Sequence, residues 1–519
     1  MVRDIDLRIE PDVVDDQQIH RRRAATHLGV DQSRIQGLVL MRRSLDARHR
    51  RPRFVLTFRA FVDEPVASVD MFRPLWRSAI GAPAVVIIGA GPAGLFAALR
   101  LLELGARPII VERGKDVRRR RRDVAEVSRG NAVDPDSNYC FGEGGAGTFS
   151  DGKLYTRSTK RGDVRRILDL LMYHGASAEI GIDAHPHIGT NKLPSVIAAM
   201  TATIREFGGE VLFDERVVAI DVSFGSVTGV RTQKGLHIPA TAVIVATGHS
   251  ADDMFEVVRQ AGAAIEQKPF AVGVRVEHPQ AYIDQCRYGT SSRHSRLPPA
   301  SYAVKTQADG RGVYSFCMCP GGIICPAATG PEQVVVNGWS PSKRNNPFAN
   351  SGIVVEVGEG DVKHLGGPEA YRGLRFQRAL ERRAWVAGGG GLVAPAQRVA
   401  DLSEGRLSPS LPACSYHPGL ASVALSEVFP AELFRRLQLA LRQFEKDMPG
   451  FVTNDAVAVA SESRTSSPVR IPRDPQTCGA RGVTGLFPCG EGAGYAGGIM
   501  SAAMDGERVA EAVRNYLFN

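Results

Sequence analysis

Cysteine is scarce in this chain, with eight residues among 519. The cysteines are scattered along the sequence, which excludes a small disulfide-stabilised scaffold and predicts free thiols in a reducing compartment. The first residues, MVRDIDLRIEP, contain no apolar stretch like the core of a secretory signal. The composition is ordinary, 43% hydrophobic and 23% charged. These features predict a cytoplasmic globular protein with more than one domain.

Charge is missing from one stretch of the chain, from Ala79 to Leu99. An apolar stretch of this length could cross a bilayer as a helix. Its centre, however, contains Gly89, Gly91 and Gly94, and the residues before them are β-branched. The stretch is therefore predicted to form a buried strand, a tight turn and a helix, and no membrane span is expected.

The turn in this stretch, Gly89-Ala90-Gly91-Pro92-Ala93-Gly94, matches the pattern G-x-G-x-x-G. The first glycine permits a tight turn, the second lets the backbone approach a pyrophosphate, and the third lets the helix pack against the strand. A pyrophosphate would lie at the positive end of that helix. We therefore predict cofactor contacts for Gly89, Gly91, Pro92, Ala93 and Gly94.

An acidic residue follows the next predicted strand, which runs from Pro108 to Val111 and leads into Glu112. A carboxylate there accepts hydrogen bonds from ribose hydroxyls and repels a 2′-phosphate, which favours FAD or NAD over NADP. Arg113 is the neighbouring candidate contact. The glycine pattern recurs at residues 142–147 and 492–497, but without the strand, helix and acid in order. Only the first copy therefore predicts a dinucleotide site.

Two later segments indicate which dinucleotide binds. Residues 241–248 predict a buried strand that ends in Ala-Thr-Gly, and residues 485–492 lead into an amphipathic helix. Together with the first turn, these segments resemble the glutathione reductase-type flavoprotein superfamily. The resemblance implies FAD, with the strand end at Gly248 beside it and an acid after the late strand on its ribityl chain. Here Glu491 replaces the usual aspartate.

The same resemblance implies that the last helix points its N-terminus at the pyrimidine side of the flavin. Gly490, Gly498 and Ile499 are the candidate contacts in this part of the chain. A partial positive charge at a helix N-terminus favours hydride acceptance by the flavin. About 400 residues separate the first motif from the last, so both ends of the chain are expected to hold one FAD.

Further segments are similar to a narrower family, the uncharacterised FAD-dependent dehydrogenases of bacteria and plant plastids. They are FGEGGAGTFSDGKL (141–154), HPHIGTNKL (185–193), KPFAVGVRVEHPQ (268–280), CMCPGG (317–322), SSPVRIPRD (466–474) and GEGAGYAGGIMSAAMDG (490–506). The segment RRSLDAR (42–48) resembles a domain appended in that family. The resemblance covers almost the whole chain and implies the fold and FAD, but no particular substrate.

The predicted fold class is α/β: an FAD/NAD(P)-binding Rossmann-like domain with a discontinuous cap (substrate) domain and a small N-terminal α+β domain. The predicted boundaries are 1–80 for the N-terminal module, 81–265 and 475–519 for the Rossmann-like domain, and 266–474 for the cap. In the N-terminal module we expect strands at 5–9, 37–43 and 53–62 and a helix at 17–28. We expect a β-meander at 210–214, 217–222 and 227–232, then short cap strands and a helix at 430–446.

A glycine-rich loop from Gly142 to Gly152 precedes Lys153. Its backbone N–H groups can converge on an anion or on the flavin edge. The family resemblance implies flavin contact through Gly145, Gly147 and Ser150, and a bare flexible loop is the alternative. Lys153, His187 and Cys319 are the candidate catalytic residues.

Each catalytic candidate has a structural alternative. Imidazole titrates near neutral pH, and His187 is preferred over His249, His278 and His417 because it lies in a family-like segment. Cys319 belongs to Cys317-Met318-Cys319, with Cys325 beyond. These thiols could face the flavin, bind a metal or be inert, but C-x-C with one further thiol lacks the usual zinc spacing, so no metal is predicted. Arg470 could hold a substrate carboxylate or pair with Asp474.

The net charge is +9, and arginines cluster at 42–53 and in the run 118–122. Because no aromatic residues are interleaved with them, solvated faces are predicted and a nucleic-acid partner is not expected. The sequence predicts an FAD-dependent oxidoreductase acting on a small molecule. NADH or NADPH visits transiently as donor, or the substrate itself supplies the electrons. The alternatives are an RNA-acting flavoprotein and a binding protein with structural FAD.

Overall fold

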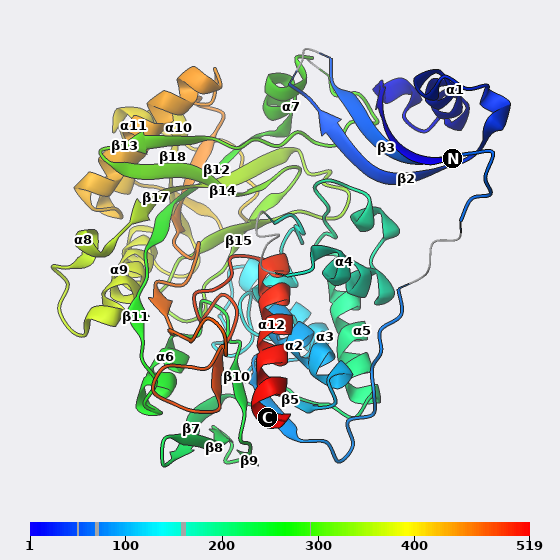
Figure 1. Cartoon of the computed structure of the whole chain (residues 1–519). Helices are drawn as coiled ribbons and strands as arrows, with labels where there is room; N and C mark the ends of the chain where they lie inside the picture. The colour runs from blue at the N-terminus through cyan, green and yellow to red at the C-terminus, as the bar shows by residue number, and fades with distance from the viewer. Residues whose placement is uncertain (49–50, 68–71, 157–161, 291, 519) are drawn as a thin grey trace.

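A computed structural model describes residues 1–48, 51–67, 72–156, 162–290 and 292–518. Arg50 of the first arginine cluster lies outside these residues. Figure 1 shows a small N-terminal unit beside a larger body, in which a parallel sheet and an antiparallel sheet occupy opposite ends. The fold is of the α/β class, with an FAD-binding Rossmann-like part and additional parts, as predicted.

The N-terminal unit is an antiparallel sheet covered by one helix. Its strands have the order β1-β3-β2, and α1 follows β1. Their bounds are β1 Val2–Ile9, α1 Gln17–Leu28, β2 Ile35–Asp46 and β3 Arg53–Val62. Buried and exposed residues alternate along β1, as expected for a sheet with one covered face. The predicted helix and strands are confirmed, and β1 and β2 extend beyond their predicted ends.

The Rossmann-like part is a parallel sheet with strand order β22-β10-β4-β5-β6. The strands are β4 Ala84–Ile88, β5 Arg107–Val111, β6 Glu210–Leu212, β10 Val243–Val245 and β22 Leu486–Pro488. Its helices are α2 Pro92–Glu103, α3 Val117–Ser128, α4 Val164–Tyr173, α5 Leu193–Glu206, α6 Asp252–Gln260 and α12 Ile499–Phe518. The last helix packs along α2 (Figure 1), so the C-terminal segment completes the sheet and the layer over it.

The β-meander contains different strands from those predicted. It consists of β7 Val217–Ser223, β8 Ser226–Thr232 and β9 His237–Pro239, in the order β7-β8-β9. The predicted strand at 210–214 was wrongly assigned to it, because β6 pairs in parallel with β5 and extends the main sheet. Three residues with one buried apolar side chain carry too little pattern to distinguish the two placements.

The cap is built on a long antiparallel sheet with strand order β13-β14-β17-β12-β20-β18-β19, in which only β18 and β19 pair in parallel. The strands are β12 Phe270–Pro279, β13 Lys305–Ala308, β14 Arg311–Cys319, β17 Phe348–Val357, β18 Ala394–Arg398, β19 Leu420–Ser422 and β20 Val457–Glu462. The helices are α7 Gln280–Tyr288, α8 Glu359–Val362, α9 Arg372–Ala387, α10 Val399–Glu404 and α11 Ala431–Asp447. Thus α11 confirms the predicted helix at 430–446. The prediction of short strands was wrong for β12 and β17, whose almost continuous burial hides the alternation that marks a strand.

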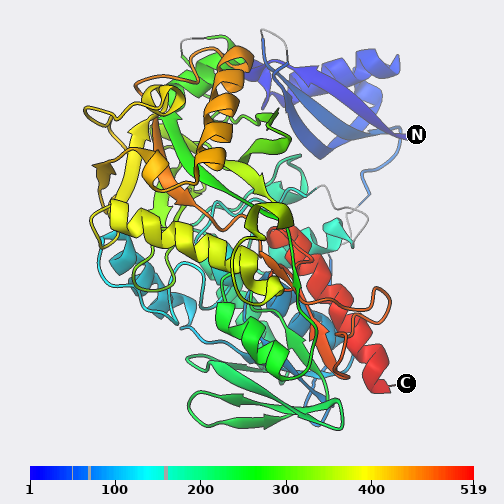
Figure 2. The same ribbon diagram turned by 90° about the vertical axis from the view of Figure 1, so that its left-hand side faces the viewer.

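Two short antiparallel strand pairs form separate two-stranded sheets. They are β11 Glu266–Gln267 with β21 Val469–Arg470, and β15 Ile323–Pro326 with β16 Val336–Trp339. Figure 2 shows α11 (orange) near the top of the molecule and α12 (red) at the lower right, where the chain ends. Buried side chains of the N-terminal sheet and of the cap form one continuous apolar cluster. The N-terminal unit is therefore packed against the rest of the protein through side chains as well as through its linker.

The apolar stretch from Ala79 to Leu99 contributes β4 and most of α2 to this fold. Its strand and turn lie inside the Rossmann-like part, as the glycines predict. Across the residues that the structure describes, helices with the length and apolarity needed to span a bilayer are absent.

Candidate active site

A cavity of about 390 Å³ lies where the carboxyl ends of the parallel strands meet the cap. Ile88, Val111 and Ala246, which end or follow β4, β5 and β10, contribute to its wall. Segments from both ends of the Rossmann-like part reach it, and so does β14 of the cap. The carboxyl edge of a parallel sheet is where dinucleotides bind in such folds.

The first glycine turn forms a cradle at one side of this cavity. Gly91 is the N-cap of α2, and no side chain caps this helix end. A Cβ added at Gly91 would meet no protein atom closer than 3.9 Å, whereas a Cβ at Gly94 would lie 2.0 Å from the carbonyl oxygen of Gly89. Gly91 therefore leaves room for a ligand, and Gly94 permits the close packing of helix and strand. An uncapped helix N-terminus with open space before it fits a diphosphate.

Glu112 is held by the backbone next to this turn. Its carboxylate accepts hydrogen bonds from the N–H groups of Ala90 (2.8 Å), Gly114 (2.9 Å) and Gly142 (3.0 Å). Arg113 extends along the same wall, with its guanidinium carbon 4.5 Å from the ring centre of Phe141. Glu112 thus fastens the glycine-rich loop to the first turn, and both Glu112 and Arg113 line the cavity.

The glycine-rich loop touches both of the other cofactor segments. A Cβ at Gly145 would lie 3.1 Å from the Gly91 Cα, and one at Gly147 would lie 3.1 Å from the side chain of Ile499. The Ser150 hydroxyl donates a hydrogen bond to the carbonyl of Gly147 (2.7 Å). The loop is therefore packed, and the alternative of a bare flexible loop does not fit these contacts.

The C-terminal segment closes the opposite wall with Glu491, Gly498 and Ile499. Behind it, Arg473 makes a buried bidentate ion pair with Asp505 (2.6 and 3.0 Å), and Asp505 also accepts the N–H of Gly490 (2.8 Å). This buried network fixes the start of α12 next to the first turn. Of the predicted cofactor residues, only Gly94 and Gly490 lie outside the cavity wall.

The Glu491 carboxyl makes the stability of the folded protein depend on pH. Burial raises the pKa of Glu491 to about 7, against the opposing effect of the Lys268 ammonium. The stabilisation that the protonated carboxyl gives the folded protein is complete below the ordinary pKa of about 4.5. It is lost as the pH rises through about 7.

In the Glu491→Gln variant this loss is absent. We expect the free energy of unfolding of the cofactor-free variant to exceed that of the cofactor-free wild type by up to about 3 kcal/mol near pH 8. The difference should nearly vanish near pH 5. Urea unfolding at the two pH values measures it, and an equal difference at both would contradict a raised pKa for Glu491 in the folded protein.

Arg120 holds the backbone of the loop at residues 138–143 through hydrogen bonds, a role that the sequence did not predict. Its side chain is 0% exposed. It donates hydrogen bonds to the carbonyls of Asn138 (2.9 Å), Tyr139 (2.8 Å) and Glu143 (2.7 Å). Burial lowers its pKa to about 10, which leaves it charged at neutral pH. The prediction of a solvated face for the run 118–122 was therefore wrong at Arg120, while its neighbours Arg118 and Arg121 are exposed.

Substituting Arg120 should unfold this wall. We expect Arg120→Met to lower the free energy of unfolding by about 3–5 kcal/mol, because buried carbonyls lose their donor. The matched control is Arg121→Met on the exposed face of the same helix, with an expected change below about 0.5 kcal/mol. Equilibrium urea unfolding of both variants tests this, and similar losses in the two would refute a supporting role.

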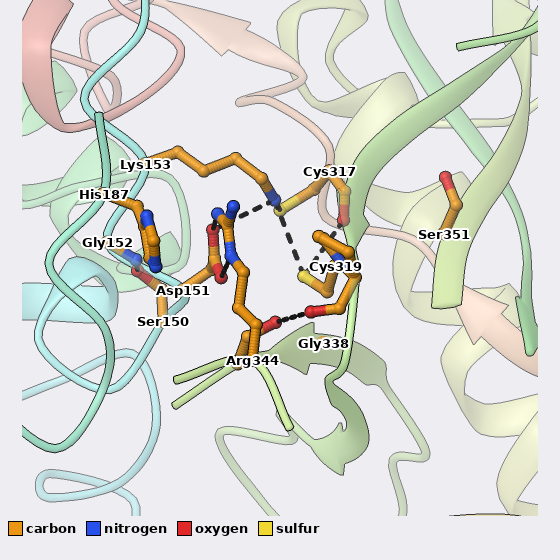
Figure 3. Close-up of polar contacts among 12 residues, drawn as sticks. Ser150, Asp151, Gly152, Lys153, His187, Cys317, Cys319, Gly338, Arg344 and Ser351 are labelled. Atoms are coloured by element: carbon orange, nitrogen blue, oxygen red, sulfur yellow. Dashed lines mark hydrogen bonds and ion pairs between the residues drawn. The ribbon is translucent and has the colours of Figure 1, made fainter. Parts of the chain in front are cut away.

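The predicted catalytic residues lie close together (Figure 3), but among the three only Lys153 lines the cavity. Lys153 lines the cavity, and its ammonium lies 3.8 Å from the Cys317 sulfur and 3.6 Å from the Cys319 sulfur. Cys317 also lines the cavity, whereas Cys319 is 0% exposed and lies behind it. His187 contributes backbone pairing to Lys153, and its Nε2 is 3.1 Å from the Ser342 carbonyl. His187 is not part of the cavity wall.

Another histidine occupies the wall instead. His249 lines the cavity, with its Nδ1 2.8 Å from the Ser250 hydroxyl. Burial, followed by the nearby Arg464 and Arg378, lowers the pKa of His249 to about 4, so the ring is neutral at physiological pH. His278 is buried away from the cavity, with Nε2 2.9 Å from the carbonyl of Phe451.

The structure also bears on the ion pair considered for Arg470 and Asp474 and on a metal site. The guanidinium of Arg470 lies 5.7 Å from the ring centre of Tyr495, and Asp474 accepts the backbone N–H groups of Gln476 and Thr477. Among the ion pairs of the described residues, none joins Arg470 to Asp474, so that alternative was wrong. Within the same residues, groups of three or more side chains arranged to hold a metal ion are absent.

Two ion pairs that the sequence did not predict lie beside Lys153 and Cys319, since Asp151 is 3.6 Å from the Lys153 ammonium and Arg275 is 3.5 Å from the Cys319 sulfur. Arg344 pairs with Asp151 through two hydrogen bonds (3.2 and 2.6 Å), and Arg275 pairs with Glu462 (2.9 Å). Arg275 interrupts an apolar run in β12. A charge inside such a run is a signal of a buried ion pair, although it does not identify the partner.

The strand-edge cavity, the uncapped helix and the carboxylate after β5 define an FAD-binding fold of the Rossmann-like type. Residues 83–134 match an FAD binding domain, 269–465 match the model "FAD-dependent protein, C-terminal domain-like", and 1–61 match a domain of unknown function. An uncharacterized protein of Clostridium beijerinckii is 40% identical over 430 residues, covering 82% of this chain and 80% of that protein. The chain belongs to the same family, the FAD-dependent oxidoreductases with this C-terminal domain, and FAD is its cofactor.

More distant similarities cover less or align less well. Thiamine thiazole synthase of Aeropyrum pernix is 31% identical over 182 residues, covering 32% of this chain and 55% of that protein. The structure of CtdE in complex with FAD is 13% identical, with a TM-score of 0.34 over 84% of this chain and 85% of the other. The open conformation of a flavocytochrome c3 fumarate reductase is 14% identical, with a TM-score of 0.36 over 85% and 80%.

Proposed function

We propose that this protein is an FAD-dependent dehydrogenase that exchanges a hydride with a small organic substrate at the cap side of the cavity. The observation that carries the proposal is the meeting of three parts of the chain around one cavity. The first glycine turn, the start of α12 and the Lys153–Cys317 pair all line the same cavity. A cofactor held by the first two would present its reactive end to the third.

The binding roles follow from the groups present. The N-terminus of α2 at Gly91 would hold the diphosphate, and Glu112 would accept hydrogen bonds from the ribose hydroxyls. Arg113 would lie at the adenosine end. At the other end, Glu491 would contact the ribityl chain, and the N–H groups of α12 at Gly498 and Ile499 would face developing negative charge.

The chemistry at the reactive end would be divided between cofactor and protein. When bound, FAD supplies a hydride acceptor or donor at its N5 atom. Lys153 keeps a positive charge beside that end, since burial opposes its charge but Cys317, Cys319 and Asp151 raise its pKa. The electron donor is either the organic substrate or a nicotinamide cofactor visiting the same cavity.

The experiment begins with purified protein and its flavin content. We expect a yellow protein with FAD that is released by heat, and anaerobic loss of the yellow absorbance with NADH, NADPH or a panel of small organic donors. Bleaching by a nicotinamide or by an organic donor identifies the electron source. A flavin-loaded protein that no donor bleaches would contradict a dehydrogenase and favour a binding protein with structural FAD.

A further inference from the structure

Strand β14 ends with Cys317, which lies at the cavity wall, and Cys319, which lies behind it. The pairing of β14 with β17 shifts between Phe316 and Cys319, and Cys317 has a positive φ of 46°. This bulge brings both sulfurs to the Lys153 ammonium (Figure 3), at 3.8 and 3.6 Å. Two residues apart, the Cα atoms lie within about 7 Å of each other. Disulfides need a separation of about 4.4–6.8 Å, so a modest adjustment at most would let the two sulfurs bond.

The charges around the sulfurs favour one thiolate. Arg344 pairs with Asp151 and Arg275 pairs with Glu462. The Lys153 ammonium lies 3.6 Å from the Asp151 carboxylate, which is paired more closely with Arg344. The cations Lys153, Arg275 and Arg344 thus outnumber the carboxylates Asp151 and Glu462, which favours a negative charge on one sulfur.

The two thiols differ in how they meet this environment. A hydrogen bond from the Cys319 thiol, with help from Lys153 and Arg275, holds the pKa of Cys317 well below its usual range. The same interaction, together with burial, raises the pKa of Cys319. Arg275 donates to the Cys317 carbonyl (2.7 Å) and lies 3.5 Å from the Cys319 sulfur. A thiolate beside a thiol is the state from which an internal disulfide forms.

We propose that Cys317 and Cys319 are a dithiol–disulfide pair, a second two-electron centre that exchanges electrons with the bound flavin. The inference rests on the proposed function and extends it. On oxidation, the Cys317 thiolate and the Cys319 thiol form an S–S bond, and two electrons and the Cys319 proton pass to oxidised FAD. In the reverse direction, reduced flavin returns the two electrons and the proton, and the S–S bond breaks.

The proposed pair accounts for the position of the Lys153 ammonium beside both sulfurs. When the disulfide forms, the thiolate charge disappears and Lys153 faces the cavity without that partner. The released negative charge resides on the reduced cofactor in the same cavity. Lys153 therefore stabilises an anion in either redox state, which keeps the two centres electrostatically linked.

Electron counting in the holoprotein tests the pair. After flavin content is measured, anaerobic titration with dithionite should consume about four electrons per FAD, two for the flavin and two for the disulfide. The Cys317→Ser and Cys319→Ser variants should consume about two. Cys286→Ser is the matched control, because Cys286 is an exposed free thiol in α7, and it should behave as the wild type.

A second readout is independent of flavin. After mild oxidation and unfolding, alkylation without reductant should leave Cys317 and Cys319 unmodified, and their peptide should be lighter by two hydrogens. Both cysteines alkylated, with about two electrons per FAD in the wild type, would overturn the pair. If the serine variants fail to fold, these wild-type results still show whether Cys317 and Cys319 form a disulfide. Protein without flavin would count instead against the proposed function, and the alkylation result would remain interpretable.

Discussion

The Gly91→Val variant is expected to fold normally and to bind FAD about 100-fold more weakly, a loss of about 2.7 kcal/mol. Gly91 has φ −74° and ψ −178°, a conformation open to any residue. A Cβ there meets no protein atom within 3.9 Å, so the added methyl groups point into space that the diphosphate would use. The substitution therefore separates ligand binding from folding.

Two control variants separate an effect on FAD binding from an effect on folding. Gly360→Val in the exposed helix α8, where an added Cβ meets nothing within 4 Å, should leave FAD affinity unchanged. Gly94→Ala places a Cβ 2.0 Å from a backbone oxygen and should destabilise the fold itself. Titration of cofactor-free protein with FAD and thermal unfolding give both quantities. A Gly91→Val variant with wild-type affinity would show that the diphosphate lies elsewhere.

The Lys153→Met variant is expected to retain FAD but to be reduced about 100-fold more slowly, or slower still, by the best donor. Its side chain is 35% exposed, and that exposure is toward the cavity. Met preserves the length and the apolar stem while removing the ammonium that lies 3.8 Å from the Cys317 sulfur and 3.6 Å from the Cys319 sulfur. Because neighbouring groups raise the pKa of Lys153, its loss should act at all pH values in the neutral range.

Stopped-flow reduction under anaerobic conditions measures this effect. Lys153→Arg, which keeps the charge, should recover part of the rate. Lys363→Met, at an exposed position after α8, should have the wild-type rate. Reduction of Lys153→Met at more than about a third of the wild-type rate would remove Lys153 from the reactive end.

Local patterns explain why the FAD-binding part could be predicted from the sequence. The turn from Gly89 to Gly94 and the acid at Glu112 lie within one strand–turn–helix–strand unit, so their spacing alone specifies their geometry. The start of α12 was predictable only through family resemblance, because β22 joins the sheet next to β10 after more than 200 intervening residues.

The reactive end could not be derived in the same way. Lys153 meets Cys317 across 164 positions, and Arg344 meets Asp151 across 193. Such pairings depend on how the cap folds over the sheet, and no local pattern encodes them. As a result, the sequence selected Cys319, whereas the structure places Cys317 at the cavity wall.

The burial of Arg120 had a signal in the sequence, but the neighbouring arginines obscured it. Val117, Arg120, Val124 and Val127 share one face of α3, so helical periodicity places this arginine among apolar residues. Its burial was obscured because it stands within five consecutive arginines. Its partners are backbone carbonyls of a loop, which leave no trace in the sequence.

Both ends of the Rossmann-like part and the glycine-rich loop are proposed to close around one FAD. Hydrogen exchange of the backbone amides, compared between cofactor-free and FAD-loaded protein, tests this proposal most directly. We expect added protection in three segments together, 89–94, 145–153 and 497–502. Protection confined to the first of these segments would contradict it.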